Sequence, residues 1–452
     1  MSSLSSDDFS KVQRIIEHYK ARIDPFKQIS TKEFVSRQKK VADGLKKKGY
    51  LVGLVFSDEH YAGDVPYLAG NINISIEQVA GVIGPTGFHV VAGLEGGYVV
   101  EQLADRSSSK VHKVGMLQLA DEQYPINAER LEDVIEAAAG KKLKDVRKIA
   151  LLTPRQILPA SVVEYLERLF GKENVVDEQE VYYKIKYIKS DMEMELIRDS
   201  TLIADAMMRA MLAVIKPGML ETEVASWAYF TALMLGAEGM GFKVILGANE
   251  ANRTLIGLAL NRPINKGDWV HLGVSPKRDG FASCNRRSII VGVTEDEWTD
   301  DQRYWFDFIE DAYKVGYEAY VNIAENDLPA KMQEQALVDF FKSRSEDVSQ
   351  RIGKSIDLEK LKPYTGTHNA GYTECQEFYG AITLDSEEPL GNQIVTMLDV
   401  ALRGIGDRWN DVVIPGFDYI VVENTLGKFG TRVECFNELP LRVQHLVGIG
   451  LE

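Results

Sequence analysis

The sequence predicts a two-domain α+β protein, with an α/β domain over residues 1–187 and a second domain over residues 188–452. Three observations lead to this prediction. The chain has 452 residues, which is more than one hydrophobic core usually serves. Its first part alternates short apolar runs, typical of buried strands, with helical patterns. Its second part groups helices together and strands together, as α+β domains do.

Local signals predict the elements of the first domain. Ser30-Thr31-Lys32-Glu33 has the spacing of a capping box, so a helix is expected from there toward Gly49. Residues 50–56 form a short run of apolar, β-prone residues, as expected for a buried strand. The same reasoning predicts strands at 78–83, 90–92 and 149–153, and helices at 131–139 and 161–170.

The pattern changes near residues 184–191, where the second domain is expected to begin. A long helix with an apolar stripe follows Ser190 or Asp191 and stops at Lys216-Pro217-Gly218. A second helix starts at Glu221. Further along, the sequence predicts a Gly-rich turn at 236–241, strands to residue 293, two helices over 297–346 and strands over 392–435.

Composition excludes several classes of function. The net charge of −15 argues against nucleic-acid binding, because phosphate contacts need clustered Lys and Arg. No apolar run reaches the roughly 18 residues of a membrane helix, so no membrane segment is expected. Residues 1–8 lack the features of a signal peptide. The three cysteines, Cys284, Cys375 and Cys435, do not form a disulfide framework. A cytoplasmic protein is therefore expected.

Five short motifs follow one another through the second domain. They are Lys189-Ser190; Lys216-Pro217-Gly218 with Glu221 and Glu223; Gly267-Asp268 with Asp279-Gly280 and Arg287; His368-Asn369-Ala370-Gly371; and Val422-Glu423-Asn424-Thr425. In this order they resemble the pita-bread family of M24-type peptidases, which includes methionine aminopeptidase, aminopeptidase P, prolidase and creatinase. The α/β first domain favours the last three. The resemblance implies a homodimer, a creatinase-like two-domain architecture and an active site in the second domain.

The peptidases of this family hold two divalent metals with Asp, Asp, His, Glu and Glu, and this chain departs from that set. The first Asp falls on Gly273, and the second, eleven residues later, falls on Cys284. The His is kept as His368 and the last Glu as Glu423, whereas the first Glu falls on Met397 or Asp399. A two-metal centre is therefore not expected, and we predict no cofactor. A single divalent ion held by Cys284, His368, Asp399 and Glu423 is the alternative.

Creatinase, as a metal-free member of the family, indicates what the remaining residues do. His368 is predicted to be a general base, since imidazole titrates near neutral pH. Glu423 would orient it or bind a cationic group, and Glu374 would share its face if one strand continued from 368 to 374. Structural roles are the alternative for these residues.

Four further residues are expected to line the substrate site: Arg287, Cys284, Asp399 and Cys375. Arg287 would bind a carboxylate. A thiol–imidazole pair of Cys284 with His368 is more plausible than one with Cys375, because seven residues along a strand span on the order of 20 Å. Buried apolar roles for both cysteines, and a structural ion pair for Arg287, stay open.

The residues and the resemblance together predict a hydrolase acting on an amide or related C–N bond. The partner would be a small molecule or a short peptide, with no nucleic acid and no membrane. Three alternatives remain: an Xaa-Pro aminopeptidase or dipeptidase with an atypical metal site, a catalytically inactive binding module, and a lyase. The fold alone does not separate them.

Overall fold

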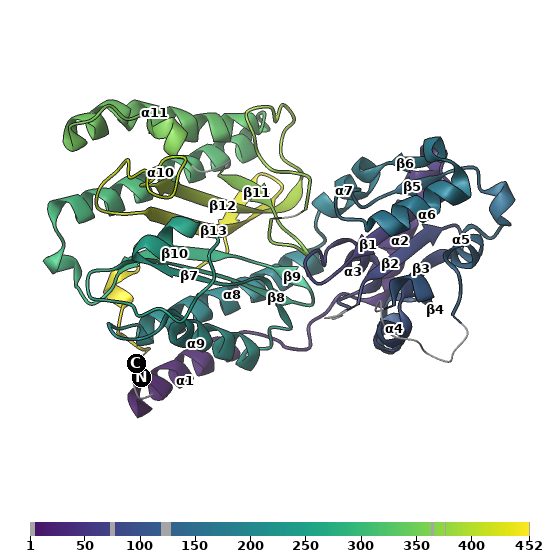
Figure 1. Ribbon diagram of the computed structural model, residues 1–452, viewed down its shortest axis with the longest axis horizontal. Coiled ribbons are helices and arrows are strands. Elements are labelled where there is room, and N and C mark those ends of the chain that lie inside the picture. The colour runs from purple at the N-terminus through teal and green to yellow at the C-terminus, as the bar shows by residue number, and fades with distance from the viewer. Residues whose placement is uncertain (1–4, 73–76, 119–127, 363–365, 376, 452) are drawn as a thin grey trace. The chain divides into compact units, whose positions relative to one another are not determined.

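The computed structural model describes residues 5–72, 77–118, 128–362, 366–375 and 377–451. The chain divides into two compact units (Figure 1). The first unit contains residues 27–188 and 371–379, and the second contains residues 1–26, 189–370 and 380–452. The expected division into 1–187 and 188–452 therefore needs correction in two segments.

The N-terminal helix α1 (Ser6–Lys20) belongs to the second unit, although it comes first in the sequence. Val12 and Ile15 of this helix are fully buried in the same apolar cluster as Ile203 and Met207. The helix begins at Ser6 because the side chain of Ser5 accepts a hydrogen bond from its first turn. The burial of its apolar stripe then fixes its place.

The described residues of the first unit form a six-stranded mixed sheet in the order β4-β3-β2-β1-β5-β6. The helices cover an apolar core that includes Leu54, Val82 and Ile135. Ser30, predicted from the sequence to begin a helix, is the N-cap of α2, and its Oγ accepts from the Glu33 amide. The elements are α2 (Thr31–Lys47), β1 (Val52–Ser57), α3 (Asp64–Ala69), β2 (Val79–Gly84), β3 (Gly87–Ala92), α4 (Leu94–Ser107), β4 (Lys110–Lys113), α5 (Leu131–Ala139), β5 (Ile149–Leu151), α6 (Ala160–Phe170), β6 (Val175–Asp177) and α7 (Gln179–Tyr187).

A buried ion-pair triad holds the distant segment 371–379 in the first unit. The Lys186 ammonium lies 2.9 Å from Asp64 Oδ1 and 2.9 Å from Glu377 Oε2, and all three side chains are buried. Burial alone would lower the pKa of Lys186, but the two carboxylates hold it above its ordinary value. Lys186 therefore joins two parts of the chain that are far apart in sequence.

The described residues of the second unit form an eight-stranded antiparallel sheet along the path β11-β12-β13-β10-β8-β7, with β14 beside β13 and β9 beside β8. The expected α+β class is confirmed. The elements are α8 (Asp191–Val214), α9 (Glu221–Met234), β7 (Gly239–Ala248), β8 (Trp269–Arg278), β9 (Phe281–Ala282), β10 (Asn285–Ile290), α10 (Asp300–Asn326), α11 (Lys331–Ile352), β11 (Thr367–Asn369), β12 (Gln393–Arg403), β13 (Tyr419–Phe429) and β14 (Arg432–Cys435).

Helices pack against one face of this sheet and leave the other for the site. Leu272 of β8 packs in one apolar cluster with residues of α8, and Asn424 of β13 donates to the Tyr313 hydroxyl of α10 at 2.9 Å. Neighbouring residues along a strand point to opposite faces. The side chains of Met397, Asp399 and Glu423 therefore point away from these helices.

The structure contains turns at the two places where the sequence predicted them. The hairpin between β8 and β9 turns at Asp279 and Gly280, with φ of 47° and 86°. The predicted Gly-rich turn at 236–241 is shorter than expected, because β7 already begins at Gly239. Among the described residues, no helix is both long and apolar enough to cross a membrane.

Candidate active site

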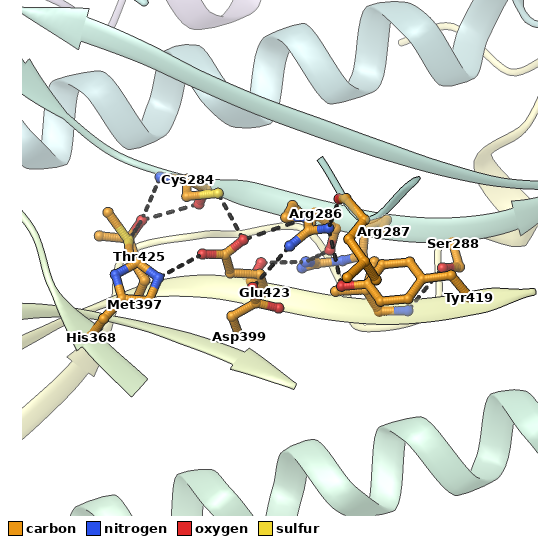
Figure 2. A network of polar contacts seen from close by, with 12 residues as sticks. Cys284, Arg286, Arg287, Ser288, His368, Met397, Asp399, Tyr419, Glu423 and Thr425 are labelled. Atoms are coloured by element: carbon orange, nitrogen blue, oxygen red, sulfur yellow. Dashed lines mark hydrogen bonds and ion pairs between the residues drawn. The ribbon is translucent and has the colours of Figure 1, made fainter. Parts of the chain in front are cut away.

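Five strands bring one residue each into a single row across the sheet. Strand pairing places Ile245 opposite Gly273, Gly273 opposite Arg286, Arg286 opposite Glu423, and Glu423 opposite Asp399. Directly paired residues point to the same face. The row therefore gathers two carboxylates, one guanidinium and one glycine on the face that the helices leave open, and Figure 2 shows the charged members meeting there.

Arg286 is the centre of this row. Its Nη1 lies 2.9 Å from Asp399 Oδ2, and its Nε lies 3.8 Å from Glu423 Oε2. Its Nη2 donates to the Leu255 carbonyl at 2.7 Å and to the Tyr419 hydroxyl at 3.1 Å. The arginine and both carboxylates are at least 96% buried. The sequence prediction did not include Arg286.

A second row carries the predicted base. His368 of β11 pairs with Met397, and Met397 pairs with Thr425. His368 Nε2 lies 3.7 Å from Glu423 Oε1, and its Nδ1 lies 3.4 Å from the Asn369 carbonyl oxygen. The His368 side chain is 16% exposed, so it is the most accessible member of the group.

Cys284 holds the other oxygen of Glu423. Its thiol donates to Glu423 Oε2 at 2.9 Å, and its amide donates to Thr425 Oγ1 at 3.0 Å (Figure 2). Cys284 and His368 therefore each meet a different oxygen of the same carboxylate. The expected thiol–imidazole pair is replaced by a thiol–carboxylate–imidazole arrangement.

A neutral histidine lies beside the guanidinium. His271 of β8 is fully buried, contacts Asn252 Oδ1 through Nδ1, and packs edge-on against the Tyr419 ring with centroids 5.1 Å apart. Burial first, and the charge of Arg286 second, hold the pKa of His271 well below its ordinary value. This imidazole therefore carries no charge at neutral pH.

Arg287 does not line the site, contrary to the sequence prediction. It follows Arg286 on the same strand and so points to the opposite face. Its Nε and both Nη groups make five hydrogen bonds to four main-chain carbonyls and to Asn424 Oδ1. It is fully buried. These contacts use every guanidinium N–H, and none is left for a substrate carboxylate.

Glu374 and Cys375 do not lie on the strand that carries His368. Strand β11 ends at Asn369, so no continuous strand carries His368 and Glu374 on one face. Glu374 and Cys375 lie in the segment 371–379 that belongs to the first unit. Glu374 is buried there, whereas Cys375 is exposed.

The residues of the second unit do not fit the two-metal centre that the resemblance implies. Gly273 offers no ligand atom, and the Asp399 carboxylate is paired with Arg286. Among the described residues of this unit, no three His, Cys, Asp or Glu side chains place their ligand atoms within 4.8 Å of one another. A divalent ion needs several such oxygen or nitrogen atoms around it.

The chain resembles known proteins along most of its length. Residues 195–370 match the family model "Metallopeptidase family M24". Identity is 23% over 351 residues with "Putative dipeptidase YkvY" of Bacillus subtilis (strain 168), which is 76% of this chain and 88% of that protein. It is 29% over 124 residues with "Uncharacterized peptidase YqhT" of the same organism, 27% of this chain and 35% of that protein.

Solved structures align with most of this chain. The prolidase of Pyrococcus horikoshii OT3 superposes with a TM-score of 0.68 at 16% identity, covering 90% of this chain and 99% of that one. The X-Pro aminopeptidase of Thermotoga maritima MSB8 gives 0.68 at 15% identity, covering 89% and 98%. The protein therefore has the pita-bread fold with its preceding α/β unit. Its residues 195–370 match metallopeptidase family M24, in agreement with the resemblance that the motif order indicated.

Proposed function

We propose that this protein hydrolyses an amide or related C–N bond in a small molecule or short peptide without a metal ion. One observation above all supports the proposal. His368 Nε2 and Glu423 Oε1 lie 3.7 Å apart on the open face of the sheet, and the motif resemblance assigns both positions to the active site. The named relatives, a putative dipeptidase among them, support a hydrolase of this kind.

His368 and Glu423 together present two hydrogen-bond acceptors to one water molecule. Nδ1–H donating to the Asn369 carbonyl leaves the lone pair of His368 on Nε2. The Cys284 thiol engages Oε2 of Glu423, so that Oε1, which has no hydrogen-bond partner among the described residues, faces the imidazole. A water donating to both atoms would be held for attack.

The reaction then needs no further group. Nε2 takes a proton from the water, and the oxygen attacks the carbonyl carbon of the substrate. The C–N bond breaks as the imidazolium returns its proton to the leaving nitrogen. Imidazole suits both steps because its ordinary pKa of about 6.5 lies near neutral pH.

A panel of amides, amidines and Xaa-Pro dipeptides tests the proposal on protein dialysed against a chelator. Turnover should survive dialysis, and His368→Ala should lower kcat by about 10²–10⁴-fold, the usual contribution of a general base. His445→Ala is the matched control, because His445 is an exposed histidine. Loss of turnover on dialysis with recovery on adding Mn²⁺, or full activity of His368→Ala, would refute the proposal.

A non-catalytic binding module is the second candidate, and one observation favours it. Arg286 and Asp399 in the middle of the row form a buried ion pair with each other, which occupies their charged groups within the chain. If no member of the panel is turned over, and substrate-like peptides still bind by calorimetry, this second function is supported. The homodimer and the cytoplasmic location belong to the proposal, and light scattering of the purified chain tests the dimer.

A further inference from the structure

We infer that the guanidinium of Arg286 is a built-in cation, which takes the place of the metal charge in this fold and excludes divalent ions from the site. Gly273 is the residue that makes room for it. The inference concerns the same residues as the proposed hydrolase but does not depend on turnover.

The first argument is steric. A Cβ atom at position 273 would lie 3.2 Å from Arg286 Cγ, 3.6 Å from Arg286 Nε and 3.2 Å from Ile245 Cβ. Ile245 and Arg286 are the two residues directly opposite Gly273 on the neighbouring strands. The Cβ of Ile245 is fixed by its strand, so only Arg286 has freedom to move. An aspartate at position 273 and the present arginine therefore compete for one space.

The second argument is electrostatic. Asp399 and Glu423 face each other directly and are both buried, so two negative charges there need a cation nearby. Arg286 lies between the two, 2.9 Å from one carboxylate and 3.8 Å from the other. In a two-metal site the ions supply this positive charge. Here a side chain supplies it.

The third argument is that neighbouring residues hold the guanidinium of Arg286 in one orientation. The Leu255 carbonyl and the Tyr419 hydroxyl both accept from Nη2, and the Tyr419 ring lies 5.5 Å from the guanidinium carbon. Leu255 has a φ of +50°, which an L residue with a branched side chain rarely adopts. Unfavourable backbone conformations of this kind concentrate at functional contacts, and here the carbonyl of the strained residue accepts a hydrogen bond from Arg286.

Metal content tests the charge argument. Purified wild type, Arg286→Lys and Arg286→Met are incubated with Mn²⁺ or Zn²⁺, gel-filtered and measured by mass spectrometry, with titration calorimetry in parallel. Wild type and Arg286→Lys should bind no ion at the site, because both retain a positive charge. Arg286→Met should bind one ion per chain, with a Kd at least about tenfold below that of any residual binding by the wild type, because the repelling charge is gone. Stoichiometric metal in wild type, or a folded Arg286→Met that stays metal-free, would overturn the inference.

Thermal unfolding tests the steric argument separately. Gly273→Ala should lower Tm in the wild type, and in an Arg286→Ala background the loss should shrink by at least about half, as expected for residues that compete for one space. Gly239→Ala is the matched control in the same sheet, because a Cβ there would meet only Lys277 Cδ at 4.0 Å. An equal loss of Tm in both backgrounds would contradict the coupling even if Arg286→Met failed to fold. Neither readout is activity, so failure here is distinguishable from failure of the proposed hydrolysis.

Discussion

At the scale of single residues, the state of the Glu423 carboxylate depends on Cys284. A thiol is a weak donor, yet this one is fully buried and points at Oε2. Occupying Oε2 fixes the rotation of the carboxylate and turns Oε1 to His368. Cys284 is thus a positioning residue in our proposal, and its reactivity as a nucleophile is not needed.

Cys284→Ala should lower the free energy of unfolding by about 1–3 kcal/mol, because a buried carboxylate oxygen loses its hydrogen-bond donor. Cys284→Ser keeps a donor and should lose less. Urea unfolding followed by tryptophan fluorescence measures both variants, since all five tryptophans lie in the second unit. Equal losses in the alanine and serine variants would show that the thiol–carboxylate contact does not matter.

At the scale of elements, helix α7 joins two kinds of ion pair within three residues. Lys186 is buried between two carboxylates, whereas Lys184 forms an exposed pair with Glu180. Exposed pairs are weakened by water and salt, whereas a buried pair that loses one member leaves a charge without compensation. The two lysines therefore differ in energy far more than their shared helix suggests.

Lys186→Met should destabilise the first unit by about 3–5 kcal/mol, because Asp64 and Glu377 would stay buried without a cation. Lys184→Met is the control on the same helix and should cost about 1 kcal/mol or less. Circular dichroism follows the unfolding of this unit. Tryptophan fluorescence, which reports the other unit, serves as the internal reference. Similar losses for the two variants would argue against the buried triad.

The edge of the first sheet contains a pH-sensitive pair. His89 on β3 is buried, with its Nδ1 2.9 Å from His112 Nε2 on β4, and His112 Nδ1 lies 2.7 Å from Glu129. Burial first, then the charges of His112 and Lys110, lower the pKa of His89 to about 4. The ordinary value is about 6.5, so the unfolded chain takes up a proton there before the folded chain does.

Stability contributed by His89 is therefore complete above about pH 6.5 and is lost as the pH falls toward about 4, by up to about 1.4 kcal/mol per pH unit. His89→Gln, which does not titrate, should flatten this dependence. Urea unfolding by circular dichroism across that pH range measures it, and His445→Gln, an exposed histidine, is the control. An unchanged slope in His89→Gln would refute the assignment.

At the scale of the whole molecule, local sequence patterns predicted the fold class, but they did not predict the contacts between segments that are far apart in the sequence. The alternation of elements, the Ser30 cap and the motif order gave the α+β class and the family. They also put His368, Glu423 and Cys284 in one site. Strand parity would also have found Arg286, because a residue two positions after Cys284 shares its face.

The exchange of segments between the units left no such signal. Residues 371–379 join the first unit through a carboxylate that pairs with a lysine 191 positions earlier, Glu377 with Lys186. Likewise α1 joins the second unit through apolar packing with a helix that starts 171 residues after its own end, at Asp191. Composition and periodicity are local, so they cannot reveal pairings of this range.

The triad at Lys186 also imposes an order on biosynthesis. Ribosomes add about 5–20 residues per second, so Glu377 is made roughly 10–40 s after Lys186. During that interval the nascent first unit holds a lysine that has only one of its two carboxylate partners. Chains stalled before residue 371 should be cut by protease within α7 faster than chains stalled beyond residue 440. Equal cutting rates would show that α7 is already stably folded before residues 371–379 are synthesised.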